Sequence, residues 1–122
     1  MAHLLTNKEF EIVTSLRFNM LAKYAGADTS WYCGITNDIQ RRLFDEHNVD
    51  EEKGVYFFWD AETKESADRV EQYVLKKFPK MAGHGGLGKE DSVYVYVYKV
   101  EDSTKEKTNE GLDFDDRDLI LG

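Results

Sequence analysis

The chain has 122 residues, a formal net charge of −8, 41% hydrophobic residues and one cysteine, Cys33. This length fits a single domain with a small core, and the composition is that of an ordinary soluble globular protein. The sequence contains no apolar run of the roughly 18 to 20 residues that a membrane span needs. One cysteine excludes an internal disulfide, and the N-terminal residues do not resemble a secretory signal, so we expect a reduced, cytoplasmic setting.

Negative charge is concentrated toward the C-terminus. Residues 101–122 carry a net charge of −5, which leaves −3 for the first hundred residues. We therefore expect one domain at 1–100 and a flexible acidic tail at 101–122. The apolar stretches LDFDD and LIL in the tail could dock on a surface, and its acids could instead mimic nucleic acid and cover a site. The balance of charge argues against a broad, non-specific nucleic-acid surface, which needs many basic contacts with phosphates.

The pattern of apolar residues predicts helices and strands in strict alternation. The predicted helices lie at 7–24, 38–47 and 64–78, and the predicted strands at 30–35, 54–60 and 92–100. Thr6 and Glu9 have the spacing of a capping box, and Asn37 can cap the second helix. This order predicts an α+β fold with a small, mostly antiparallel sheet flanked by helices, in which the apolar strand at 54–60 is central. An alternative for 18–24 is a strand that turns at 25–28 into the next one.

The strand at 30–35 presents two different faces. Its alternation directs Trp31, Cys33 and Ile35 into the core, and Tyr32 and Gly34 to the opposite side. A glycine inside a strand usually marks the close approach of another backbone or of a ligand. We therefore expect Tyr32 to stand over an open floor at Gly34.

Charged side chains on the next two predicted helices complete a candidate site. Arg42 lies next to the buried face of its helix, Arg41 points further out, and His47 lies in the last turn. Glu71 falls within a mostly apolar stripe, where an unpaired carboxylate is costly and requires an arginine, a metal ion or a hydrogen-bond network. The structural alternatives are an ion pair between Arg42 and Glu71, and a favourable interaction of His47 with the helix dipole. The chemical alternative is phosphate cleavage, in which a guanidinium neutralises phosphate, a carboxylate holds a divalent cation and a tyrosine helps to activate water.

At these residues the sequence resembles the GIY-YIG nuclease domain. Residues 32–48, YCGITNDIQRRLFDEHN, resemble the second motif of the family with its following helix, and residues 66–78 resemble the later helix that carries a metal-binding glutamate. The resemblance implies metal-dependent hydrolysis of DNA phosphodiester bonds. Tyr32 would help to generate the nucleophile, Arg42 would stabilise the phosphate, Glu71 would bind Mg²⁺ or Mn²⁺, and His47 completes the catalytic set. The candidate substrate contacts are Gly34, Arg41 and Tyr96.

The sequence departs from the family at three points, one of which is that the family's late asparagine has no clear match. The tripeptide GIY does not precede residue 32, and a histidine four residues after Arg42 would fall at Glu46, whereas His47 lies about 100° further around an α-helix. The strand at 92–100 could supply the missing phenol as a permuted element if residues 93–99 pair with 30–35 or 54–60, because its tyrosines share one face: Tyr94, Tyr96 and Tyr98. The alternative function is a degenerate member of the family that keeps the fold and acts as a binding or interaction module.

The glycine-rich stretch at 82–91 matches a nucleotide-binding phosphate loop in part. Gly83, Gly88 and Lys89 have the required spacing, but Glu90 stands where that motif needs serine or threonine. A predicted helix precedes the stretch and a strand follows it, which is the reverse of the order that the motif needs. We therefore expect a mobile loop and no binding of a nucleoside triphosphate.

Overall fold

The computed structural model describes residues 5–22, 31–78, 81–83 and 90–106. Its elements are α1 (Asn7–Arg17), η1 (Phe18–Ala22), β1 (Trp31–Thr36), η3 (Gln40–Glu46), β2 (Tyr56–Asp60), α2 (Lys64–Lys77) and β3 (Tyr94–Lys99). The predicted α+β class is confirmed, and 18–22 continue α1 as helix, so the strand alternative for this stretch is wrong. No described helix is both long and apolar enough to cross a bilayer. The predictions for 23–30, for the 84–89 part of the glycine-rich stretch and for the tail beyond 106 fall outside the described residues.

The three strands form an antiparallel sheet in the order β1-β3-β2. The expectation that 54–60 is the central strand is therefore wrong, because β3 lies between the other two. Burial explains the difference: Tyr96 on β3 is fully buried, whereas Phe58, its neighbour on β2, is 49% exposed. The apolar composition of β2 thus reflects packing of an edge strand against helices. The pairing that the permuted-strand hypothesis requires is present, since β3 pairs with both β1 and β2.

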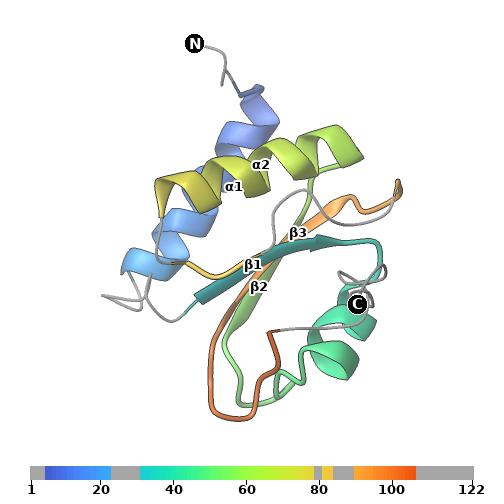
Figure 1. Cartoon of the computed structure of the whole chain (residues 1–122). Coiled ribbons are helices and arrows are strands. Elements are labelled where there is room, and N and C mark those ends of the chain that lie inside the picture. Colours follow the sequence, from blue (N-terminus) through green and yellow to red (C-terminus); the bar gives the residue numbers. More distant parts are fainter. Residues whose placement is uncertain (1–4, 23–30, 79–80, 84–89, 107–122) are drawn as a thin grey trace, which may run out of the picture.

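Helices cover both faces of the sheet (Figure 1). On one face, α1 and α2 pack against Trp31, Cys33 and Val97 in the larger core cluster. On the other face, Leu43 of η3 packs against a smaller cluster that contains three tyrosines: Tyr32, Tyr96 and Tyr98. The predicted alternation of β1 is thereby confirmed, and it separates an apolar core from a layer of phenols.

A buried carboxylate joins the two helices of the larger core. Thr6 and Glu9 form the predicted capping box at the start of α1. The Glu9 carboxylate also accepts hydrogen bonds from Arg69 Nη2 at 2.8 Å and Ser66 Oγ at 2.5 Å on α2. The hydrogen bonds from Arg69 are the largest of the effects that lower the pKa of Glu9 to about 2. This ion pair fixes α2, and with it Glu71, relative to α1.

Candidate functional site

The turn into η3 is set by a threonine and an aspartate. Thr36 Oγ1 accepts a hydrogen bond from the backbone N–H of Asp38 at 3.1 Å, and Asp38 Oδ1 accepts one from the backbone N–H of Arg41 at 3.1 Å. Asp38 therefore takes the capping role that we expected of Asn37. The Asn37 side chain instead donates to Asp91 and accepts from Arg41. This arrangement starts the helix directly after β1, next to the face that carries Tyr32.

The hydrogen bonds of η3 place Arg42 and His47 on the same side of the helix. Residues 40–46 form a π-helix, in which each bond spans five residues, and the backbone N–H of His47 donates to the carbonyl of Arg42 at 2.9 Å. In an α-helix, residues five apart would lie about 140° apart around the axis. A turn that is closed by a hydrogen bond between residues five apart brings His47 close to the side of the helix on which Arg42 lies. Such π-helical turns are frequent at functional sites. The spacing of His47 predicted a rotation away from Arg42 around an α-helix, and the π-helical hydrogen bonds remove this rotation.

The hydroxyl group of Tyr96 is the point where these side chains meet. Arg42 Nε donates to it at 3.0 Å, and His47 Nε2 lies 2.7 Å from it. Arg42 is 4% exposed, and both Tyr96 and His47 are fully buried. One phenol oxygen is therefore held between a guanidinium and an imidazole, away from bulk water.

The carbonyl of Lys105 determines the direction of the hydrogen bonds. This oxygen lies 2.6 Å from His47 Nδ1 and can only accept, so we assign the hydrogen to Nδ1. In neutral His47, Nε2 is then the acceptor for the Tyr96 hydroxyl. The chain of donors runs from Arg42 through Tyr96 and His47 to the carbonyl of Lys105. This order gives the Tyr96 proton a defined acceptor.

Tyr32 and Tyr98 complete the layer of rings around His47. The ring centroid of Tyr32 lies 4.6 Å from that of His47 and 5.2 Å from that of Tyr98, its direct cross-strand neighbour. Burial is the main cause that raises the pKa of each of the three phenols, and the nearby Arg42 opposes the rise at Tyr32 and Tyr96. All three hydroxyls are therefore neutral at physiological pH.

The space above Gly34 is filled by Tyr96. Gly34 pairs with Tyr96 across the β1–β3 ladder, and a Cβ atom on Gly34 would lie 2.5 Å from the Tyr96 hydroxyl oxygen. The expectation of an open floor at Gly34 is therefore wrong, because a side chain of the neighbouring strand, and not a backbone or a ligand, fills the space. The absence of a side chain at Gly34 allows the phenol to lie flat against the sheet, within reach of Arg42 and His47.

Glu46, which occupies the position expected for the family's histidine, pairs with both arginines of η3. Arg42 Nη1 donates to Glu46 Oε1 at 2.7 Å, and Arg41 Nε donates to Glu46 Oε2 at 3.0 Å. The side chain of Arg41 is about one third exposed, whereas that of Arg42 is nearly buried. The two arginines thus share one carboxylate, and Arg41 is the one that faces solvent.

Glu71 lies on α2, in the helical layer on the opposite face of the sheet from η3. It is 3% exposed, and its charge raises the pKa of Tyr32 and of Cys33, so its field reaches β1. Among the described residues, no three side chains of His, Cys, Asp or Glu gather in a way that could hold a metal ion. A Mg²⁺ ion at Glu71 would therefore need most of its ligands from water and from phosphate, which is a common arrangement for this ion.

Residues 101–106 pack onto the site, although the sequence indicated that they begin a flexible tail. The Tyr98 hydroxyl donates to Glu106 Oε2 at 2.8 Å, and the backbone N–H of Lys105 donates to the carbonyl of His47 at 2.7 Å. Asn48, at a positive φ of 60°, ends the turn after η3 and donates to the carbonyl of Ser103 at 2.9 Å. Tyr98 was expected only as one of three tyrosines that could replace the missing phenol, and Glu106 was expected in the tail. The alternation of side chains along β3 could have indicated Tyr98, because Tyr98 lies two residues from Tyr96 and therefore on the same face of the strand.

Comparisons with profiles of protein families, with curated proteins and with solved structures find no match for this chain. The resemblance to the GIY-YIG domain therefore depends on the residues described above, and the function that it implies is a proposal.

Proposed function

We propose that the protein is a GIY-YIG-like endonuclease that hydrolyses phosphodiester bonds of DNA with Mg²⁺ or Mn²⁺. The observation that carries this proposal is the Tyr96 hydroxyl held between Arg42 Nε and His47 Nε2. A tyrosine, an arginine and a histidine are the groups that the resemblance implies, and here the tyrosine comes from β3. The single buried cysteine is consistent with an intracellular location for such an enzyme.

The hydrogen-bond chain provides a route for a proton. Transfer of the Tyr96 proton to His47 Nε2 would leave a phenolate beside the Arg42 guanidinium, which stabilises the negative charge. The imidazolium formed at His47 would be stabilised by the carbonyl of Lys105. Tyr96 and His47 are fully buried, so the site must open before the phenolate can accept a proton from the attacking water. Arg42 or the more exposed Arg41 would then neutralise a phosphate oxygen.

Glu71 is the residue that would hold the metal ion. A divalent ion supplies charge stabilisation at the transferred phosphate when it is bound. One protein carboxylate suffices for Mg²⁺ where water and phosphate complete its shell, so Glu71 fits this role as an anchor. Its charge acts on Tyr32, which Arg42 also contacts, so the carboxylate and the guanidinium act on the same phenol.

Cleavage of supercoiled plasmid DNA in Mg²⁺ or Mn²⁺ tests the proposal. We expect wild-type protein to nick the plasmid, and Tyr96→Phe and Glu71→Gln each to lower the rate at least about 100-fold, the effect of losing a group that moves a proton or anchors an ion. Tyr94→Phe removes a hydroxyl from the same face of β3 outside the network and should change the rate less than about twofold. Equal cleavage by wild type and Glu71→Gln would point to a contaminant and contradict the proposal.

The second candidate is a degenerate domain that binds a partner without catalysis. The observation that favours it is the burial of the network, because Tyr96, His47 and Tyr98 are each fully buried. Under this alternative, the hydrogen bonds stabilise the fold, and Tyr96→Phe lowers stability without any loss of activity. Absence of cleavage by the wild type across supercoiled, linear and branched DNA would favour this candidate.

A further inference from the structure

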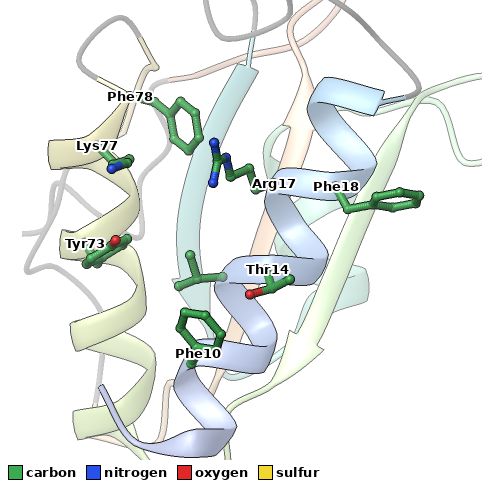
Figure 2. Close-up of a pocket in the computed structure, with 8 residues that line it drawn as sticks. Phe10, Thr14, Arg17, Phe18, Tyr73, Lys77 and Phe78 are labelled. Atoms are coloured by element: carbon green, nitrogen blue, oxygen red, sulfur yellow. The ribbon is translucent and has the colours of Figure 1, made fainter. Parts of the chain in front are cut away.

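A groove between α1 and α2 lies apart from the tyrosine network, in the helical layer on the other face of the sheet. It has a volume of about 510 Å³, and four of its lining residues are aromatic (Figure 2). Phe10 of α1 and Phe18, the first residue of η1, are each 62% exposed, which is unusual for phenylalanine. The opposite wall carries Tyr73 and Phe78 from α2 and its C-terminal end. Such a groove between two helices is a common docking site for an amphipathic segment.

Two exposed cations also line the groove. Arg17 lies on α1 and Lys77 on α2 (Figure 2). Within the part of the chain that the structure describes, neither side chain forms an ion pair. The groove therefore combines aromatic surface with unneutralised positive charge, in a protein whose net charge is −8. An occupant with apolar side chains and negative charge would complement both features.

We infer that the C-terminal segment 115–121 of the same chain docks in this groove. The segment contains three acids and one base, and its apolar residues are Leu119, Ile120 and Leu121. The apolar residues can insert among the aromatic rings, while the acids face Arg17 and Lys77. DNA is a poorer match for the groove, because the first hundred residues carry a net charge of −3 and would repel phosphates beyond the two cations.

The length of the chain after its last described residue permits docking within one molecule. Glu106 is held at Tyr98 by a hydrogen bond of 2.8 Å, and residues 107–114 connect it to the docking segment. At roughly 3.3 Å per residue the chain from Glu106 to Asp115 spans up to roughly 30 Å. A domain of about 100 residues has a radius of gyration of about 13 Å, so this connection is long enough to pass around the sheet to α1 and α2.

A nitroxide spin label at the end of the full chain tests the inference. Cys33 is fully buried, so Gly122→Cys provides a selective site for the label. We expect the label to cause loss of the amide signals of Thr14, Arg17 and Lys77 in a ¹⁵N-labelled sample. Signals of residues on η3 should be retained. Loss of signals on η3 with retention of those in the groove would overturn the inference.

Charge reversal provides matched variants. Arg17→Glu combined with Lys77→Glu should restore the lost signals, whereas Lys76→Glu, an exposed lysine on α2 that does not line the groove, should not. Asp115→Lys combined with Asp116→Lys reverses the charge of the segment and should also restore the signals without altering the folded helices. Signal loss that is unaffected by all these changes would overturn the inference.

A mixed sample distinguishes docking within one chain from docking between copies. Spin-labelled chain without ¹⁵N is added to ¹⁵N-labelled chain without a spin label. We expect no loss of signal from the groove in this mixture. Loss there would show that the segment occupies the groove of a second copy, which contradicts docking within the same chain.

Discussion

Replacing Gly34 by alanine tests whether Tyr96 is held against the sheet by the absence of a side chain. The new Cβ atom would lie 2.5 Å from the Tyr96 hydroxyl oxygen, 2.7 Å from Cζ and 3.0 Å from Cε2. These distances are too short for non-bonded atoms, so the ring must move. Tyr96 is fully buried and bonded to Arg42 and His47, so movement strains the packing and breaks at least one hydrogen bond.

The expected cost combines three effects. Overpacking of a well-packed core costs about 1 to 3 kcal/mol. Loss of the bond from the charged Arg42 costs about 1.5 to 3 kcal/mol. The lower entropy of the unfolded chain with alanine offsets about 0.4 to 1 kcal/mol of this. We expect Gly34→Ala to lower the free energy of unfolding by about 2 to 4 kcal/mol, measured by urea denaturation with tryptophan fluorescence.

Variants at position 96 provide the test of this reasoning. Tyr96→Phe removes the nearest atom, so Gly34→Ala should cost less in that background than in the wild type. Tyr96→Val removes the ring, and there the alanine should change the free energy of unfolding by less than about 1 kcal/mol. A cost of Gly34→Ala that is the same in all three backgrounds would refute the steric argument.

Two further predictions concern pH. The pKa of Glu9 is lowered to about 2, chiefly by hydrogen bonds from Arg69, so its ionisation contributes stability that is present above about pH 4.5 and is lost as the pH falls toward 2. Because the Arg69 side chain is about half exposed, we expect Glu9→Gln to cost roughly 1 to 2 kcal/mol at pH 7 and progressively less below pH 4.5 in acid denaturation. A cost that stays the same between pH 7 and pH 2 would contradict this expectation. Burial raises the pKa of three phenols, so the unfolded chain ionises first and stability should fall as the pH rises above about 10. Ultraviolet difference spectra should therefore show less phenolate at pH 10.5 in the folded chain than in denaturant, and equal amounts would contradict the burial of these residues: Tyr32, Tyr96 and Tyr98.

The elements of the fold could be predicted because their signals are local. Apolar periodicity located the helices and strands, the spacing of Thr6 and Glu9 indicated the start of α1, and alternation assigned Tyr32 to the face opposite the larger core. The central position of β3 was not predictable in this way, since strand order depends on contacts between residues far apart in sequence. The apolar character of β2 suggested burial on both faces, but it did not distinguish a central strand from an edge strand under helices.

The candidate site could be predicted only in part. Tyr32, Arg42 and the tyrosine row were identified, because residue type and parity are visible in the sequence. The relation of His47 to Arg42 was not, since it depends on whether the bonds of η3 span four residues or five. The contacts of Glu106 were also not predicted, because the polar composition of 101–122 indicated a tail. The bond from Tyr98 to Glu106 is a tertiary contact that no local pattern indicates.

The π-helix at 40–46 has a consequence for how related chains should be sought. A pattern search uses a fixed number of residues between two side chains. It therefore assumes that the same number of residues always gives the same distance and direction between them. Here an extra residue between the guanidinium and the imidazole is accommodated by the wider turn, so both still reach the same phenol. If one residue were deleted from this turn and the turn became α-helical, the arginine and the histidine would be four residues apart. They would then still lie on the same side of the helix. Search patterns that allow either interval would therefore recover chains that a fixed interval overlooks.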